Sequence, residues 1–290
     1  MNNMSPFDNI SAIGKLTSYE FESLCRYFSS YAMLGEKTGL ARVLTRYKMF
    51  VDTTDSSLVP HLVMDGFWET PVTQSLVRLV KPGDVCVDVG AHLGYFSILM
   101  SALAGEEGKT LAVEPNVNIA AMLRRTAAIN HPGFVVWEGA LANETKELEI
   151  HIPKSKTGDS SLLVRADSGE EGFIHQRVLA TTMDQLLVNL DIGNVNVIKI
   201  DAEGAEPFIF EGMEEVLKKN KELRIVMEFS PYLYRDPEAF STYLLGRFDV
   251  YKIASGFNLE ETDAGRFGEW SGLKSHVDLL LAPKGTGRPY

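Results

Sequence analysis

From residue 70 onward, apolar segments of two kinds alternate along the chain. Short runs rich in valine, isoleucine and leucine are typical of buried strands, whereas longer stretches with apolar residues every three or four positions are typical of helices. We predict strands at 85–89, 110–114, 134–138, 195–200 and 224–229. We predict helices at 71–80 (capped by Thr70), 94–104, 117–129, 206–219 and 237–245. This alternation indicates an α/β fold with a mostly parallel sheet that carries helices on both faces.

The N-terminal segment, residues 1–70, has a different pattern. An amphipathic helix begins at a capping box formed by Thr17 and Glu20, and a shorter helical pattern ends near Tyr47, before a short strand. Alone, the segment is too small to bury a sizeable core. We therefore predict an N-terminal helical cap that packs on a main domain of residues 71–290.

Two further segments interrupt the alternation. Residues 146–181 contain two stretches of alternating polar and apolar residues, which predict strands inserted between the third and fourth strands of the sheet. Because loops at the edge of a sheet often hold substrates, we expect this insertion and the cap to cover a substrate. Near the C-terminus, residues 249–254 and 276–282 predict a closing antiparallel strand pair.

Composition narrows the partners of the chain. Its 28 basic and 39 acidic residues give a formal charge of −11, and no dense basic tract offsets that charge. Surfaces that bind nucleic acid are usually basic, so we predict no polynucleotide partner. The first ten residues lack the pattern of a signal peptide, and no apolar run approaches the roughly 20 residues that span a bilayer. We predict a cytoplasmic protein without a membrane span, and the sequence leaves its oligomeric state open.

The stretch VCVDVGAHLGYFSILM, residues 85–100, has the order strand, glycine turn and helix that begins many nucleotide-binding folds. The dinucleotide fingerprint is G-x-G-x-x-G, whereas this turn runs from Gly90 to Gly94 with His92 in the middle. Asp88 would also place a negative charge beside a bound pyrophosphate. S-adenosylmethionine has no phosphate, and its amine is attracted by an acid. The turn therefore predicts S-adenosylmethionine as the cofactor.

The second predicted strand adds an independent signal, because it ends at Glu114. An acid at this position accepts hydrogen bonds from the ribose hydroxyls of an adenosine. A nicotinamide dinucleotide shares that feature. Glu114 therefore supports an adenosine ligand, and Asp88 together with the glycine spacing selects S-adenosylmethionine.

Five segments, in the order VDVGAHLGYFS, AVEPN, LATTMDQLL, IKIDAEGAE and IVMEFSP, resemble the FkbM-type methyltransferases. This is a family of S-adenosylmethionine-dependent O-methyltransferases, and the resemblance covers roughly residues 50–282. IKIDAEGAE is the most specific segment, since class I methyltransferases in general lack it. The family usually has Asn-Ile where this chain has His92-Leu93. The resemblance implies a Rossmann-like class I methyltransferase fold and methyl transfer to a hydroxyl of a small molecule or glycan, such as a sugar, a glycolipid or a specialised metabolite.

The resemblance also places Trp68 and Glu69, in the segment DGFWETP, beside the cofactor pocket. Ala140 follows the third predicted strand, where an adenine ring commonly rests. The residues that we expect to contact the cofactor are Glu69, Asp88, Gly90, Ala91, His92, Gly94, Tyr95, Glu114, Pro115, Asn116, Ala140 and Asp201.

Three acids, Asp201, Glu203 and Glu206, come just past the carboxyl end of the fourth predicted strand, where open α/β sheets bind ligands. A hydroxyl acceptor needs help to lose its proton, and Asp201 is our first candidate for the general base, with Glu203 second. Alternatively, Asp201, Glu203 and Glu228 hold Mg²⁺ through their carboxylate oxygens. Glu206 equally fits a structural role at a helix N-terminus.

Two other functions remain open from the sequence. An NAD(P)-dependent oxidoreductase shares the strand-turn-helix start and Glu114, but it conflicts with Asp88 and with the glycine spacing. A non-catalytic protein of the same fold would bind S-adenosylmethionine without transferring its methyl group, and it would be expected to lack the acids or the glycine turn. Both features are present, so we favour the O-methyltransferase.

Overall fold

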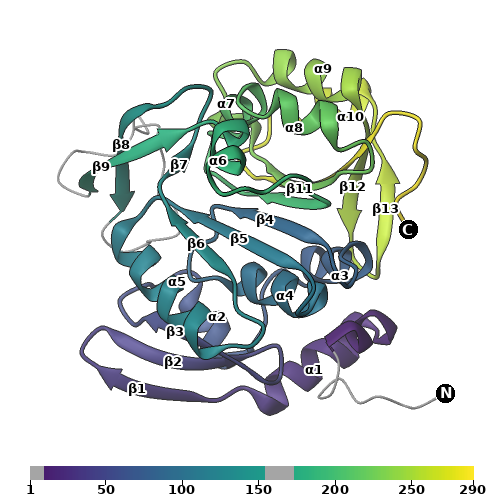
Figure 1. The fold of residues 1–290 in the computed structure, drawn as a ribbon. Coiled ribbons are helices and arrows are strands. Elements are labelled where there is room, and N and C mark those ends of the chain that lie inside the picture. Colours follow the sequence, from purple (N-terminus) through teal and green to yellow (C-terminus); the bar gives the residue numbers. More distant parts are fainter. Residues whose placement is uncertain (1–9, 154–172) are drawn as a thin grey trace.

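An eight-stranded sheet runs through the centre of the molecule (Figure 1). The structure is a computed structural model that describes residues 10–153 and 173–290. The strands of the sheet lie in the order β13-β12-β14-β11-β10-β4-β5-β6. Their bounds are β4 (Val85–Val89), β5 (Lys109–Glu114), β6 (Val135–Glu138), β10 (Val197–Ile200), β11 (Arg224–Phe229), β12 (Phe248–Ala254), β13 (Asn258–Glu261) and β14 (Val277–Pro283). All five strands predicted for the main alternation are present.

The strands from β6 to β11 pair in parallel, and β14 pairs antiparallel with both β11 and β12. The predicted closing antiparallel pair is therefore confirmed. The chain also forms β13 and helix α10 (Ala264–Trp270) between these two strands, and neither was predicted. Both elements are short, so their residues show too little periodicity to identify a strand or a helix.

Helices cover both faces of the sheet (Figure 1). One face carries α3 (Thr70–Leu79), α4 (Tyr95–Ala104) and α5 (Val117–Ile129); the other carries α6 (Met183–Asn189), α7 (Glu206–Glu211), α8 (Glu214–Lys219), α9 (Pro237–Arg247) and α10. Successive strand residues point to opposite faces. Cys86 packs with α3 and α4, whereas Val87 and Val89 pack with the helices of the other face. No helix within the described residues is long and apolar enough to cross a membrane.

Residues 206–219 form two helices, α7 and α8, rather than the single helix predicted. A Cβ atom at Gly212, between them, would lie 2.1 Å from the carbonyl oxygen of Ala142. The chain at Ala142 therefore packs directly against the break. This contact joins residues that are far apart in the sequence, so the local pattern gave no sign of it.

The N-terminal segment contains a small sheet as well as helices. After the 3₁₀ helix η1 (Ile10–Lys15) and α1 (Ser18–Phe28), an antiparallel sheet of β1 (Tyr31–Gly35), β2 (Thr38–Val43) and β3 (Tyr47–Asp52) precedes α2 (Val59–Met64). The capping box of Thr17 and Glu20 is confirmed. The helical pattern predicted up to Tyr47 is wrong. Those residues lie mainly in β2, which pairs antiparallel with β3. The short strand predicted after them is present as β3, and the Phe50 N–H in it donates to Thr126 Oγ1 of α5 at 3.0 Å.

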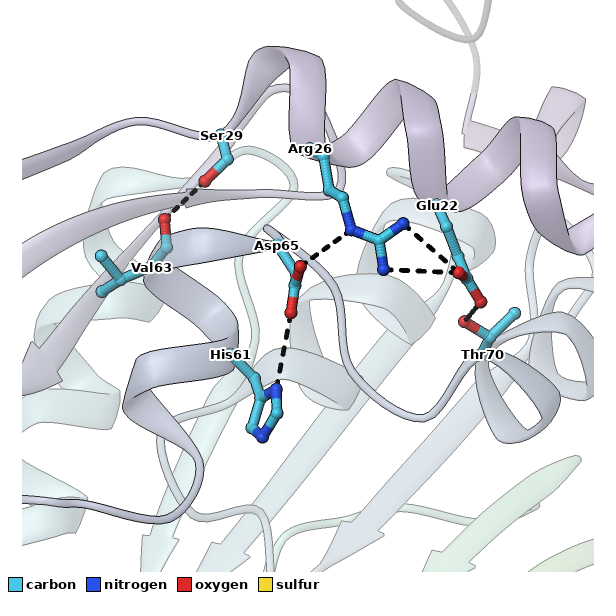
Figure 2. Close-up of polar contacts among 7 residues, drawn as sticks. All are labelled: Glu22, Arg26, Ser29, His61, Val63, Asp65 and Thr70. Carbon is cyan, nitrogen blue, oxygen red and sulfur yellow. Dashed lines mark hydrogen bonds and ion pairs between the residues drawn. The ribbon is translucent and has the colours of Figure 1, made fainter.

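Polar contacts join α1 to the short segment between α2 and α3 (Figure 2). Arg26 Nε lies 2.8 Å from Asp65 Oδ1, and the Thr70 hydroxyl donates to Glu22 Oε1 at 2.9 Å. Thr70 is thus the first residue of α3 rather than its cap, and Glu69 takes the cap position with a φ of 38°. The contacts hold both ends of the segment that carries Glu69.

The insertion forms a second three-stranded sheet, in the order β7-β9-β8. It consists of β7 (Ala140–Leu141), β8 (Lys146–Pro153) and β9 (Phe173–Thr181). The two strands predicted within residues 146–181 are confirmed, and the part of the insertion at 154–172 lies outside the described residues.

Candidate active site

A cavity of about 430 Å³ opens at the carboxyl edge of the large sheet. It lies where β4 has β5 on one side and β10 on the other, the position at which open α/β sheets bind ligands. Its volume is within the range of about 300–1,000 Å³ that is typical of small-molecule sites. Of the residues expected to contact the cofactor, those that line the cavity are Glu69, Gly90, Ala91, His92, Gly94, Tyr95, Glu114, Pro115, Ala140 and Asp201.

The turn after β4 needs glycine at both of its glycine positions. Gly90 has a φ of 73° and Gly94 a φ of 96°, in the left-handed region that side chains disfavour. A Cβ atom at Gly90 would lie 1.7 Å from the carbonyl oxygen of Asp201, and one at Gly94 would lie 2.4 Å from the side chain of Leu123. The two glycines therefore allow the turn to pack against the loop after β10 and against α5.

Gly90→Ala is expected to abolish cofactor binding, because the loops after β4 and β10 must move apart. It should also lower the free energy of unfolding by about 1–3 kcal/mol for the overpacking, on top of about 1–2 kcal/mol for a left-handed alanine. Gly83→Ala is the matched control, since Gly83 has a φ of 88° and nothing lies within 4 Å of its Cβ position. Urea denaturation and calorimetry with S-adenosylmethionine measure both effects. Equal losses in the two variants would contradict the importance of the Asp201 contact.

Glu114 is held at the cavity wall by two backbone groups. The His92 N–H donates to Oε2 at 2.9 Å, and the Asn116 N–H donates to Oε1 at 2.8 Å. Burial raises the pKa of Glu114 to about 7, although both hydrogen bonds favour the charged form. The carboxylate is therefore fixed at the end of β5, the place expected for an acid that binds ribose hydroxyls.

Two of the residues expected to contact the cofactor do not line the cavity. Asp88 is fully buried beneath the turn, where the Ser97 hydroxyl donates to its Oδ2 at 2.6 Å. Burial raises the pKa of Asp88, while the charge of Lys199 and the bond from Ser97 lower it. Asp88 thus supports the first turn of α4 from inside, and direct contact with a cofactor amine is not what the structure shows. Asn116 caps α5 by accepting from the Asn118 N–H at 3.1 Å.

Lys199, which the sequence analysis did not single out, brings a positive charge to the site. Its Nζ lies 3.0 Å from Asp201 Oδ2 and 4.7 Å from the centre of the Phe96 ring, and its side chain is 6% exposed. Burial alone would lower the pKa of Lys199, but the charges of Asp201, Asp88 and Glu69 together raise it. The ammonium group therefore stays protonated among these acids. The sequence signal for it is a lone charge within an apolar strand.

Two carboxyl groups beside Asp201 have pKa values raised towards neutrality. Burial, with the negative charges of neighbouring acids, raises the pKa of Glu69 to about 8. Burial and the charge of Asp201 raise the pKa of Glu228 to about 7, against the influence of His276. His276 Nδ1 lies 3.2 Å from Glu228 Oε2, and both residues line the cavity. Carboxyl groups of this kind can exchange protons near neutral pH.

Glu206 has a structural role at the start of α7, which was one of the two roles considered for it from the sequence. Its carboxylate is buried and accepts from the Ala202 N–H at 2.7 Å and from the Gly204 N–H at 3.0 Å. These bonds shape the loop after β10 and place Glu203 on the cavity wall.

Left-handed backbone conformations gather around this cavity. Glu69, His92 and Glu203 have φ values of 38°, 49° and 49°, and all three line it. Such conformations cost about 1–3 kcal/mol each for residues with side chains, and they concentrate at functional sites. The backbone geometry therefore points to the same place as the perturbed pKa values.

The acids proposed as magnesium ligands are not gathered as a group of three ligands in the described part of the chain. Asp201, Glu203 and Glu228 all line the cavity. Their oxygens nevertheless do not all come within 4.8 Å of one another. Asp201 Oδ2 is also engaged by the ammonium group of Lys199. The structure therefore gives no support for a Mg²⁺ site, and we assign no metal to the cavity.

The sheet has antiparallel β14 between β11 and β12, and a cavity opens at the carboxyl end of β4. This arrangement is that of the Rossmann-like fold of class I methyltransferases, the class that uses S-adenosylmethionine. The model of the Methyltransferase FkbM domain matches residues 88–248, more than half of the chain. The chain therefore belongs to the FkbM methyltransferase family. This membership argues against the nicotinamide-dependent oxidoreductase. No curated protein sequence matches the chain.

Similar solved structures include three methyltransferases. A precorrin-6y C5,15-methyltransferase from Geobacter metallireducens is 15% identical, with 75% of this chain and 90% of that chain covered and a TM-score of 0.41. A Pyrococcus abyssi tRNA (uracil-54, C5)-methyltransferase in complex with S-adenosyl-L-homocysteine is 12% identical, with 86% of this chain and 45% of that chain covered and a TM-score of 0.44. A TehB-like methyltransferase from Corynebacterium glutamicum is 10% identical, with 79% of this chain and 96% of that chain covered and a TM-score of 0.43.

Proposed function

We propose that this protein transfers the methyl group of S-adenosylmethionine to a hydroxyl group of a small molecule or glycan, such as a sugar, a glycolipid or a specialised metabolite. The observation that carries the proposal is the gathering of Glu69, Asp201 and Glu228 on the cavity wall. A hydroxyl is a poor nucleophile, so its methylation needs a group that takes its proton. An efficient base has a pKa near the working pH, and the pKa of Glu228, which is raised to about 7, lies in that range.

The residues of the cavity fit the proposed cofactor at three places. Glu114 accepts hydrogen bonds from the ribose hydroxyls, and Ala140 offers an apolar wall to the adenine ring. The turn from Gly90 to Gly94 allows close approach of the methionine part. Glu69, which faces the cavity, replaces Asp88 as the partner for the amine. When bound, the cofactor supplies an activated methyl group on a sulfonium, which is a good neutral leaving group.

Asp201 remains our first candidate for the base, and the structure gives it a defined orientation. Lys199 Nζ donates to Oδ2, which holds the carboxylate in one position, and we assign Oδ1 to the acceptor hydroxyl. Holding the base and the acceptor together lowers the entropic cost of the reaction. Glu203 stays the second candidate, and the position of Glu228 adds a third.

Two segments outside the large sheet, the insertion and the N-terminal segment, border the part of the cavity in which we place the acceptor. Ile150 of β8 lines the cavity, so the insertion borders it, and Trp68 from the segment before α3 lines it as well. The acids of the cavity and the net charge of −11 favour an uncharged hydroxyl compound over a polynucleotide. This supports the expectation that the acceptor is a small molecule or a glycan.

The test of the proposed function is to identify the methylated product. The protein is incubated with S-adenosylmethionine labelled in its methyl group and with pools of sugars, glycolipids and other hydroxyl compounds. Nuclear magnetic resonance of the labelled product then shows which atom carries the methyl group. We expect a methyl ether. A label found on nitrogen, on carbon or on RNA would overturn the proposal.

Glu114→Gln is expected to weaken binding of S-adenosylmethionine by about 10- to 150-fold, the equivalent of about 1.5–3 kcal/mol for a hydrogen bond to a charged group. Both oxygens of Glu114 accept from backbone N–H groups, and a glutamine NH₂ cannot replace either of them. Calorimetry measures the affinity, with NAD as the comparison ligand for the wild-type protein. Equal affinities for NAD and S-adenosylmethionine would contradict the assignment of the cofactor.

A further inference from the structure

The hairpin of β8 and β9 carries a group of side chains that the proposed reaction does not use. Glu149, His151 and His175 each offer one possible ligand atom, and these atoms all lie within 4.8 Å of one another. Sequence spacing gave no sign of this group, because the strand pairing brings its members together. It lies outside the methyl-transfer cavity.

The geometry of the group follows from the register of the hairpin. His151 and His175 are direct partners across the antiparallel ladder, and their ring centres are 4.7 Å apart. Glu149 is two residues before His151 and therefore points to the same face of the strand. His175 Nδ1 lies 3.3 Å from Glu149 Oε1. Three ligands of suitable chemistry thus converge on one face of a regular strand pair.

These distances match a metal site of tetrahedral geometry. Two ligands bound to one Zn²⁺ at about 2.0–2.1 Å are roughly 3.3 Å apart, which is the separation already present between His175 and Glu149. The possible ligand atom of His151 lies within 4.8 Å of the other two. Imidazole with carboxylate suits Zn²⁺ and its neighbours in the transition series, whereas Mg²⁺ prefers oxygen ligands.

We propose that Glu149, His151 and His175 form a binding site for a divalent transition-metal ion, with Zn²⁺ as the best match. The three protein ligands leave a fourth position for water or for an outside group. The site lies on the outer face of the hairpin, where His175 and Glu149 are about half exposed, so an ion has direct access from solvent. This proposal does not depend on the identity of the acceptor.

The ion would fix the hairpin whose inner face meets the cofactor cavity. Ile150, between two of the ligands, is buried on the opposite face and lines that cavity. Gln176, the ladder partner of Ile150, donates through Nε2 to the carbonyl oxygen of Pro115 at 3.0 Å. A metal that joins the two strands on the outside would therefore hold Ile150 and Gln176 in register on the inside.

Titration of the metal-stripped, full-length protein with Zn²⁺ tests the site, and the protein must carry no histidine tag. Calorimetry is expected to show one Zn²⁺ bound per chain. His151→Gln and His175→Gln should each weaken the affinity by more than about tenfold, since loss of even indirect support for a ligand costs that much. These side chains are not buried, and circular dichroism of the metal-free variants checks that they fold.

Two controls separate a built site from general binding to surface histidines. Arg177→Gln changes the residue opposite Glu149 without removing a ligand, so affinity for Zn²⁺ should stay or rise as a nearby positive charge is lost. His61→Gln removes an exposed histidine elsewhere and should have no effect. If the wild-type protein and His175→Gln take up Zn²⁺ equally, or neither does, the contact between His175 and Glu149 is only an ion pair and the proposal is overturned.

Hydrogen exchange gives a second readout. Zn²⁺ should slow amide exchange in β8 and β9 and leave the β1–β2 hairpin unchanged. Exchange in β8 and β9 that does not respond to a bound ion would overturn the clamping role.

Discussion

Asp201→Asn is expected to lower the turnover number by about 10²–10⁴, the usual cost of losing a positioned base, while cofactor affinity is largely retained. Asparagine has the size of aspartate and can still accept the hydrogen bond from Lys199, so the loop after β10 should keep its shape. It cannot take a proton from a hydroxyl. Single-turnover kinetics at saturating S-adenosylmethionine measure the rate, and calorimetry with S-adenosylhomocysteine measures the affinity.

Variants of neighbouring acids decide which carboxylate is the base. Glu203 and Glu228 line the same cavity, so Glu203→Gln and Glu228→Gln are the direct comparisons. Glu222→Gln removes one acid just before β11, at the opposite edge of the sheet, and should leave turnover unchanged. If Asp201→Asn reacts at the wild-type rate while Glu228→Gln loses activity, then Glu228 is the base and Asp201 only positions Lys199.

Much of the fold could be predicted because the central strands are buried on both faces. The runs at 85–89 and 224–229 are apolar with few interruptions, and their predicted bounds agree with β4 and β11. The helix at 117–129 was also predicted with its observed bounds. Glu114 could be identified because an acid at the end of such a strand faces the edge where ligands bind.

The features that escaped prediction depend on contacts between distant segments. Asp88 stands in the sequence as an acid next to a turn, but packing of α4 over β4 buries it completely. The residues before Tyr47 form β2 instead of a helix because they pair with β3, which is itself bound to Thr126 of α5. His151 and His175 become neighbours only through the register of β8 with β9. Local periodicity carries no information about such pairings.

Lys199 also escaped prediction because its role depends on contacts with distant residues. In the sequence it is one charge in an apolar strand, whereas in the structure it stands between the buried acid beneath the turn and the acids of the cavity. Asp88 Oδ1 has no hydrogen-bond partner among the described residues, so the charge of Lys199 is a main compensation for that buried carboxylate. Stability and chemistry are therefore coupled at this lysine.

Lys199→Met is expected to lower the free energy of unfolding by about 3–5 kcal/mol at neutral pH, the usual cost of removing one partner of a buried ion pair. Methionine fills much of the same space but loses the contact of the ammonium group with the Phe96 ring, so the loss of stability reports the missing charge rather than a cavity. In the double variant Lys199→Met with Asp88→Asn, most of the stability should return, because no uncompensated charge remains beneath the turn.

Lys146→Met is the control, since it removes a surface ion pair with Glu144 and should change stability by less than about 1 kcal/mol. Urea denaturation measures all four proteins. If Lys199→Met loses no more stability than Lys146→Met, then Asp88 and the other buried acids are protonated and neutral in the folded protein, and they do not need the charge of Lys199.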